Sequence, residues 1–288
     1  MNHSTFKSFT FGIGLFFTLP LVYGNSSSLS FSDGTLYINK SKTHKVAPVK
    51  YGFHYEEIGM MGEGALHAEL IRNRSFEEAT PPAGLSVKNG LYENVPAPRV
   101  KEKKVFQADP LIGWTTYPLS YTPVFISRTD ENPMSGENKY SMLVNVTEDI
   151  ANHSDALILN RGYYGMNLKT DTSYRLSLFL KNRNYSAPLR VFLVDEWGQR
   201  VSNVIEVNVG NRDWTKYTGE LKPEKNVRRG MFAIQPMSKG QFQVDVVSLF
   251  PSDTWNDGKS VFRKDIVQNL KEFSPSFIRF PGGCIVHG

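Results

Sequence analysis

The sequence predicts a mixed α/β and β fold, in which a β-sandwich is inserted into an α/β domain. Three stretches with different residue patterns lead to this prediction. Residues 25–80 combine short strand patterns with one helical pattern. Residues 81–252 consist of short alternating strands separated by turn signals, and residues 253–288 return to one helix and one strand. The α/β pattern therefore begins before the β region and resumes after it.

The first α/β stretch contains two predicted strands and one predicted helix. Thr35–Ile38 and Val49–Tyr55 are the strand patterns. The helix is predicted over Gly64–Arg72, because Leu66 and Leu70 have the spacing of a buried helical stripe.

The β region opens with a loop-rich segment that contains Pro81-Pro82-Ala83-Gly84. Many short strands spaced about 10 to 15 residues apart, with alternating faces, are typical of a β-sandwich or jelly roll. Asp195-Glu196-Trp197-Gly198 predicts a hairpin turn within it. The predicted strands are Tyr140–Val146, Tyr174–Leu180, Leu189–Leu193, Val204–Val209, Trp214–Tyr217 and Phe242–Val246.

The last stretch contains an amphipathic helix, a strand and a glycine-rich turn. Phe262–Leu270 carries its apolar residues on one side, and Ser274-Pro275 is expected to end this helix. Phe277–Phe280 is the predicted strand, and Pro281-Gly282-Gly283 allows the backbone to turn sharply after it. In α/β folds, ligands bind at such carboxyl ends of strands.

Residues 1–24 have the features of a secretory signal peptide. Lys7 is the only early charge, an apolar run spans Phe9–Val22, and cleavage is expected after the small Gly24. An uncleaved membrane anchor is the alternative, but the run is shorter than the roughly 20 residues of a spanning helix, and Pro20 interrupts it. We therefore expect a secreted or periplasmic protein without a membrane segment after cleavage.

The composition disfavours several classes of function. The net charge of +5 is spread over short clusters such as Lys101–Lys104, without the continuous basic stripe of a nucleic-acid-binding protein. Cys284 is the only cysteine, so an internal disulfide is excluded, and a small apolar filler is a better interpretation of it than a nucleophile. The histidines lack the paired spacing of a metal site, and no phosphate loop, dinucleotide fingerprint or serine-hydrolase elbow occurs. We predict neither a metal nor a cofactor.

Polar residues at two strand ends are candidates for a binding site. Glu56 and Glu57 close the strand that begins near Val49, and only one of them can point into a pocket because successive strand residues face opposite sides. A tight loop with Gly62 follows this strand, and Arg279 stands at the end of the other strand. A carboxylate, a guanidinium and a closely approaching backbone suit a polyhydroxylated ligand. A polar strand end facing solvent is the alternative.

Aromatic residues of the β region allow a second kind of site. Tyr163, Tyr164, Trp197 and Trp214 could form a platform on which sugar rings stack. The alternative is packing in the core or rim of the sandwich, where aromatic residues dominate.

Two groups of motifs resemble a known family. Tyr51–Ile58 and Gly64–Glu77 resemble the amino-terminal signature of the α-L-arabinofuranosidases of glycoside hydrolase family 51, in the form with an inserted carbohydrate-binding-like β-sandwich. Phe262–Asp265 followed by Ser274–Cys284 is similar to the second barrel strand of that family. The resemblance implies the start of a (β/α)8 barrel, first strands and helices only, interrupted by a jelly-roll or galactose-binding-like β-sandwich. It also implies a retaining hydrolase that releases terminal α-L-arabinofuranosyl groups from arabinose-containing plant polysaccharides.

The resemblance implies three substrate-binding residues. Glu56 matches a carboxylate that contacts arabinose hydroxyls, Arg279 matches an arginine that orders the site, and Cys284 matches a position that lines the sugar pocket. The Met60–Glu63 loop differs from its usual counterparts, so linkage preference is not predicted.

The resemblance assigns no catalytic residue to this chain. Retaining hydrolysis needs an acid and a nucleophilic carboxylate roughly 5 Å apart. In the family both glutamates lie on later barrel strands, so the chain alone is expected to be inactive. Family members often form oligomers, which leaves a homo-oligomer open for a full-length protein. A non-catalytic carbohydrate-binding protein that acts through the β-sandwich is the alternative.

Overall fold

The computed structural model describes residues 51–56, 60–78, 85–88, 91–94, 105–107, 109–118, 121–150 and 155–280. These residues fall within the second of the chain's two units, which spans Val49–Gly288. The signal peptide and the strand predicted at Thr35–Ile38 lie outside the described residues. No helix in these ranges is long and apolar enough to cross a membrane.

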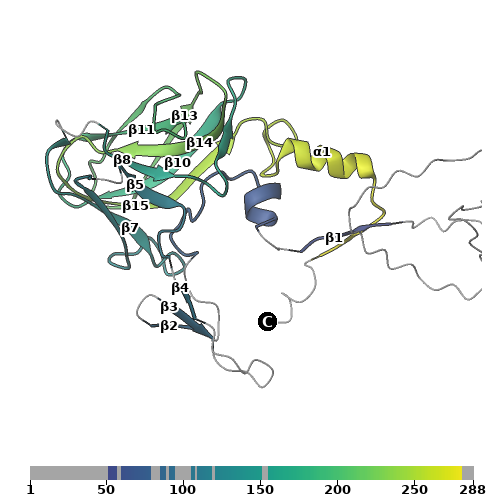
Figure 1. Cartoon of the computed structure of the whole chain (residues 1–288), viewed down its shortest axis with the longest axis horizontal. Coiled ribbons are helices and arrows are strands. Elements are labelled where there is room, and N and C mark those ends of the chain that lie inside the picture. Colours follow the sequence, from purple (N-terminus) through teal and green to yellow (C-terminus); the bar gives the residue numbers. More distant parts are fainter. Residues whose placement is uncertain are drawn as a thin grey trace, which may run out of the picture. The chain divides into compact units, whose positions relative to one another are not determined.

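Two antiparallel sheets share one hydrophobic core and make up most of the described residues (Figure 1). One sheet has the order β13(Thr215–Leu221), β10(Tyr174–Asn182), β15(Gly240–Pro251), β7(Ser141–Val146) and β6(Val124–Thr129). The other has the order β12(Ile205–Asn208), β11(Pro188–Val194), β14(Val227–Gln235), β8(Leu157–Asn160) and β5(Trp114–Tyr117), and β9(Met166–Leu168) pairs with β14. A separate small sheet consists of β2(Leu85–Lys88), β3(Leu91–Asn94) and β4(Val105–Gln107).

The core between the two large sheets follows from the alternation of the strands. On β10, Leu176, Leu178 and Leu180 are buried, while the intervening residues are partly or fully exposed. They pack with buried residues of the facing sheet such as Val191 and Ile234. Each such side chain contributes about 1.5–3 kcal/mol by leaving water. The strands predicted from this alternation are confirmed, and the turn at Asp195–Gly198 is closed by a 3.0 Å hydrogen bond from the Gly198 N–H to the Asp195 carbonyl.

The two ends of the described chain form a parallel strand pair. β1(Phe53–His54) pairs with β16(Ile278–Arg279), and α1(Lys264–Phe273) directly precedes β16 (Figure 1). The helix and strand predicted at Phe262–Leu270 and Phe277–Phe280 are thus confirmed, with shifted bounds. α1 ends as expected before proline, because Ser274 adopts a left-handed φ of 48°.

The helix predicted over Gly64–Arg72 is wrong. A single π-helical turn, η1(Gly62–Leu66), is followed by extended chain. The N–H of Ala68 donates to the Val261 carbonyl at 2.8 Å, and the N–H of Leu70 donates to the Leu249 carbonyl at 3.1 Å. Pairing with distant chain replaces the helical hydrogen bonds. We call residues 67–78 the strap.

The strap is part of the sandwich core. Ile71 and Phe76 are fully buried in the same cluster as the strands, and the Phe76 ring lies 5.6 Å from that of Trp114. The Trp114 indole N–H donates to the Asn73 carbonyl at 3.1 Å. The segment that follows β1 is therefore fixed to the sandwich by both packing and hydrogen bonds.

Candidate functional site

The pairing of β1 with β16 sets the geometry of the candidate site. His54 lies opposite Arg279, and the N–H of Tyr55 donates to the Arg279 carbonyl at 2.9 Å. Because the strands are parallel, their carboxyl ends meet at one edge. Glu56 follows β1 at this edge, and Arg279 ends β16 there.

The two faces of this strand pair differ in chemistry. The Phe273 ring of α1 lies 6.5 Å from the Tyr51 ring and 5.6 Å from the Phe53 ring, so the helix covers the face that carries Tyr51 and Phe53. Side chains alternate along a strand. His54 and Arg279, and Glu56 two residues beyond His54, therefore belong to the opposite face. The alternation of side chains therefore assigns Glu56 and Arg279 to the same edge and the same face.

A glycine permits this pairing. A Cβ atom at Gly52 would stand 2.5 Å from the Phe277 carbonyl oxygen and 2.6 Å from the Phe277 ring. Only a residue without a side chain allows the two backbones to approach this closely.

The predicted site residues differ in exposure, and some lie outside the described ranges. Glu56 is half-buried and has an interaction partner, and Arg279 is exposed. Glu57, Pro281-Gly282-Gly283 and Cys284 lie outside the described residues.

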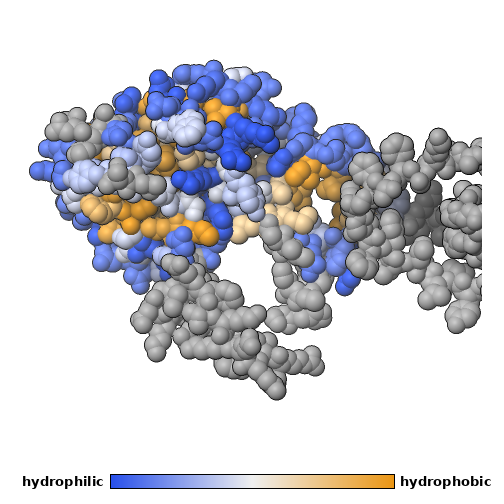
Figure 2. Space-filling model, viewed as in Figure 1, coloured by the Kyte–Doolittle hydropathy of each residue, from blue (hydrophilic) through white to orange (hydrophobic). Residues whose placement is uncertain are grey.

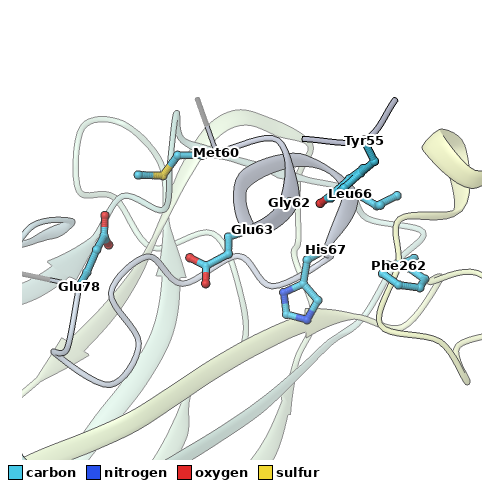
Figure 3. Close-up of a pocket in the computed structure, with 8 residues that line it drawn as sticks. All are labelled: Tyr55, Met60, Gly62, Glu63, Leu66, His67, Glu78 and Phe262. Atoms are coloured by element: carbon cyan, nitrogen blue, oxygen red, sulfur yellow. The ribbon is translucent and has the colours of Figure 1, made fainter. Parts of the chain in front are cut away.

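A cavity of about 680 Å³ opens beside the end of β1. Its wall combines residues of η1 and the strap with Phe262, which precedes α1. Figure 3 shows the carboxylates of Glu63 and Glu78 toward one side of the cavity, with Tyr55, Leu66 and Phe262 toward the other. The lining residues are Tyr55, Met60, Gly62, Glu63, Leu66, His67, Glu78 and Phe262.

One carboxylate of this cavity is held by an arginine of the strap. Arg72 Nη2 donates to Glu78 Oε1 at 2.7 Å, and Arg72 Nε donates to the same oxygen at 3.1 Å. The paired geometry orients the carboxylate more strongly than a single contact would. Glu78 is therefore a fixed acceptor at the rim of the cavity.

The second carboxylate contacts the sandwich. The Tyr163 hydroxyl, from the connection between β8 and β9, donates to Glu63 Oε2 at 3.4 Å. Burial, and then the negative charge of Glu63, raises the pKa of Tyr163 well above its usual value, so the hydroxyl keeps its proton at neutral pH. A Cβ atom at Gly64 would meet the Tyr163 ring at 3.1 Å. The sandwich thus packs directly against the loop that follows β1.

The sequence did not predict this cavity as a site. Gly62 marked a tight loop after β1, but Glu63, Glu78 and Tyr163 carry no local pattern that joins them. Their proximity depends on the path of the strap.

The aromatic residues considered for sugar stacking divide into two groups. Tyr164 and Trp197 are 81% and 72% exposed, respectively. Tyr163 and Trp214 are half-buried, and the Trp214 indole N–H donates to the Asn132 carbonyl at 3.1 Å. Tyr163 and Trp214 therefore have packing roles, and only Tyr164 and Trp197 present open rings.

Apolar side chains also gather at the surface beside α1 (Figure 2). Large exposed apolar patches are typical of surfaces that contact other protein. The exposed apolar residues of α1, β16 and their neighbours are Tyr51, Val261, Phe262, Phe273, Phe277, Ile278 and Phe280.

Comparisons with known proteins agree with the family resemblance. No protein-family model matches the chain. The chain is 26% identical over 243 residues to Alpha-L-arabinofuranosidase 1 of Arabidopsis thaliana, a match that covers 83% of this chain and 32% of the relative. It is 26% identical over 239 residues to the extracellular exo-α-L-arabinofuranosidase of Streptomyces chartreusis. This match covers 82% of this chain and 24% of the relative.

A solved structure gives the same result. An arabinose-bound α-L-arabinofuranosidase of glycoside hydrolase family 51 matches with a TM-score of 0.64 and 25% sequence identity. This match covers 85% of this chain and 36% of the other. The predicted resemblance to family 51 α-L-arabinofuranosidases is confirmed, and the chain spans only 24% to 36% of the length of these relatives.

Proposed function

We propose, from its similarity to the α-L-arabinofuranosidases, that this chain is part of a retaining glycoside hydrolase. Its substrate would be a terminal α-L-arabinofuranosyl group of an arabinose-containing plant polysaccharide. β1 and β16 are the first two strands of a (β/α)8 barrel in this proposal, and residues 81–252 form a carbohydrate-binding-like sandwich inserted between them. Residues 1–24 direct the protein to an extracytoplasmic location.

The observation that carries the proposal is the parallel pairing of β1 with β16. The sandwich separates these strands in sequence, yet they are neighbours with one face covered by α1. A parallel pair with a helix on one face is the repeating unit of a (β/α)8 barrel. The exposed apolar residues of β16 and α1 supply surface on which further barrel elements can pack.

Glu56 and Arg279 hold the sugar in this proposal. The Glu56 carboxylate accepts hydrogen bonds from arabinose hydroxyls, and the Arg279 guanidinium donates hydrogen bonds at the same edge. Cys284 lines the pocket as the family resemblance implies.

No residue of this chain is assigned as acid/base or nucleophile. Glu56 and Glu57 are adjacent, and neighbouring residues of an extended strand point to opposite sides, so they cannot bracket a glycosidic bond. Glu78 is engaged by Arg72. In this proposal Glu56 and Arg279 bind the sugar, and its cleavage requires two carboxylates other than Glu56, Glu57 and Glu78.

Binding of a short α-L-arabinofuranosyl oligosaccharide to the full chain tests the proposal. We expect isothermal titration calorimetry to detect weak binding that Glu56→Gln and Arg279→Lys each reduce at least fivefold. Glu206→Gln, an exposed site on β12, is the matched control. No turnover of an aryl α-L-arabinofuranoside is expected, and enzyme-like turnover lost in Glu56→Gln would refute the assigned division of roles.

A second candidate is a carbohydrate-binding role of the sandwich. It is favoured by the exposed rings of Tyr164 and Trp197, since exposed aromatic faces can cover sugar C–H groups. Affinity electrophoresis of the full chain in arabinoxylan separates the two candidates. Retardation lost in Trp197→Ala or Tyr164→Ala, but kept in Glu56→Gln, would support the sandwich, and unretarded migration of the native chain would count against it.

A further inference from the structure

A second cavity, of about 660 Å³, lies on the outer face of the sheet that contains β13, β10 and β15. Tyr174 and Leu178 of β10 point into the sandwich core. Because side chains alternate along a strand, Arg175 and Ser177 belong to the outer face, and both line the cavity. None of the aromatic residues considered above for sugar stacking lines it. We call it the Arg175 cavity.

Two opposite charges are neighbours on the floor of this cavity without pairing. The register places Arg175 of β10 directly between Glu220 of β13 and Phe250 of β15. Cross-strand neighbours of opposite charge normally attract each other. Here Arg175 Nη2 donates to the Gly258 carbonyl at 3.2 Å, and Glu220 Oε2 lies 3.7 Å from Lys222 Nζ. Among the described residues no carboxylate pairs with Arg175, so its charge is not neutralised.

Hydroxyl groups and an aromatic ring complete the floor. In the next outward-facing row, Ser177 stands between Thr218 and Ser248. The Ser248 hydroxyl donates to Glu69, whereas the hydroxyls of Ser177 and Thr218 form no hydrogen bond within the described ranges. A hydroxyl both donates and accepts, so these two groups match the hydroxyls of a sugar. The half-buried Phe250 adds an apolar surface beside them.

A tight turn before α1 forms the rim of the cavity and carries a second cation. The N–H of Ser260 donates to the Trp255 carbonyl at 3.1 Å. Gly258 has a φ of 79°, and a Cβ atom there would stand 2.6 Å from the Ser252 carbonyl oxygen, so this turn requires glycine. Lys259 lines the cavity from the turn and is exposed, and it forms no ion pair with any described residue. The turn therefore adds positive charge above the floor.

We propose that the Arg175 cavity binds a uronic acid residue of an acidic polysaccharide. Arg175 uses one of its five N–H donors on the turn, and the others suit the two oxygens of a sugar carboxylate. Lys259 adds a second positive charge to this end of the cavity. The ring hydroxyls pair with Ser177 and Thr218, and the C–H groups of the ring pack on Phe250. The proposal rests on the proposed function for the source of the ligand, a plant polysaccharide.

Other anionic ligands fit this cavity less well. A peptide that adds a strand needs a free sheet edge, but β10 is flanked by β13 on one side and by β15 on the other. A phosphate group carries close to two negative charges, so Glu220 would repel it more strongly than it repels a single carboxylate. A neutral sugar would leave the charges of Arg175 and Lys259 unused.

Binding of tetragalacturonate to the full chain tests the proposal. Complete methyl esterification removes the charges of this oligosaccharide and keeps its rings, so the ester is the matched ligand. By isothermal titration calorimetry we expect the ester to bind at least tenfold more weakly, and added NaCl to weaken the binding of tetragalacturonate. Arg175→Gln and Lys259→Gln should each lower the affinity at least fivefold. Arg212→Gln, at an exposed position outside the cavity, is the control and should not.

A gain of affinity protects the test against misfolding. Glu220→Gln removes a negative charge beside Arg175 and should tighten the binding of tetragalacturonate at least twofold, a result that misfolding cannot produce. Glu56→Gln should leave this affinity unchanged while it weakens the binding of the short α-L-arabinofuranosyl oligosaccharide. The two ligands therefore separate this proposal from the proposed function, because each can fail without the other.

Three results would overturn the proposal. They are no binding of millimolar tetragalacturonate, equal affinity for its methyl ester, and unchanged affinity in Arg175→Gln. Hexaglutamate is the probe for an acidic protein, and we expect it not to bind. Binding of hexaglutamate as tight as that of tetragalacturonate would also refute the assignment to a sugar.

Discussion

The Glu69 carboxylate of the strap accepts the backbone N–H of Leu249 on β15 at 2.8 Å. The same carboxylate accepts the Ile71 N–H at 3.0 Å and the Ser248 hydroxyl at 2.6 Å. Burial raises the pKa of Glu69 above its usual value, although these hydrogen bonds act in the opposite direction. One buried side chain therefore links the segment after β1 to the central strand of a sandwich sheet.

Removal of this carboxylate should destabilise the protein strongly. Glu69→Ala leaves two backbone N–H groups and one hydroxyl buried without an acceptor, and we expect a loss of about 3 kcal/mol in the free energy of unfolding. Glu69→Gln keeps an acceptor oxygen for Leu249 and Ile71 and should cost about 1 kcal/mol. Urea denaturation measures both values. Equal losses in the two variants would show that the hydrogen bonds to Leu249 and Ile71 contribute little.

The strap illustrates what the sequence could not specify. The spacing of Leu66 and Leu70 fits a helical stripe, but a four-residue spacing also occurs in extended chain that changes direction. The partners that decide the outcome, Val261 and Leu249, lie more than 150 residues away in sequence. Ile71 and Phe76 are apolar in either conformation, so their burial in the sandwich carries no local signal.

The strands could be predicted where one face is buried and the other is not. β10 alternates and was predicted, whereas β14 was missed because Met231–Gln235 is buried on both faces and shows no alternation. The placement of Glu56 and Arg279 at one edge follows from strand ends and the family resemblance. The contact of Tyr163 with Glu63 depends on tertiary structure alone.

Gly52→Ala should disrupt the pairing of β1 with β16. The new Cβ would stand 2.5 Å from the Phe277 carbonyl oxygen, a backbone atom that cannot rotate away. We expect amide hydrogen exchange of Phe53 and Tyr55 to accelerate at least tenfold, because both N–H groups donate to β16 or the residue before it. Gly136→Ala is the control, since nothing lies within 4 Å of the position that its new methyl group would occupy. Unchanged protection of Phe53 and Tyr55 would contradict the assigned register.

Asp195→Asn should change the acid dependence of stability. Burial would raise the pKa of Asp195, but hydrogen bonds from Lys225, Gln199 and Trp197 outweigh it and lower the pKa below its usual value. A carboxylate whose pKa is lowered in the folded protein stabilises the fold at pH values above its unfolded pKa of about 3.9. This contribution is lost as the pH falls through the folded pKa.

At pH 7 the free energy of unfolding of the native chain should therefore exceed that of Asp195→Asn by about 1 kcal/mol. This value is modest because Lys225 is largely exposed. The difference should shrink as the pH falls through the lowered folded pKa of Asp195. Urea denaturation across this range measures it, with Asp213→Asn as a surface control. A difference that stays constant with pH would rule out the charged form of Asp195 as the cause.

Gly64→Ala tests whether the sandwich holds the loop after β1. The added Cβ would lie 3.1 Å from both the Tyr163 ring and Met60 Cβ, so the ring must shift by a few tenths of an ångström. We expect a loss of about 1 kcal/mol in the free energy of unfolding and faster exchange of the Gly64 amide, which donates to the Met60 carbonyl at 2.8 Å. Gly210→Ala, with open space around it, is the control.

The double variant with Tyr163→Ala separates contact with the sandwich from strain within the loop. If Tyr163 causes the crowding, Gly64→Ala should cost at least 0.5 kcal/mol less in the Tyr163→Ala background, within the usual range of about 0.5–3 kcal/mol for residues in contact. If Met60 alone causes it, the cost should be the same in both backgrounds. Additive losses would therefore mean that the loop beside the candidate sugar site keeps its conformation without the sandwich, and that Tyr163 only fills space at its rim.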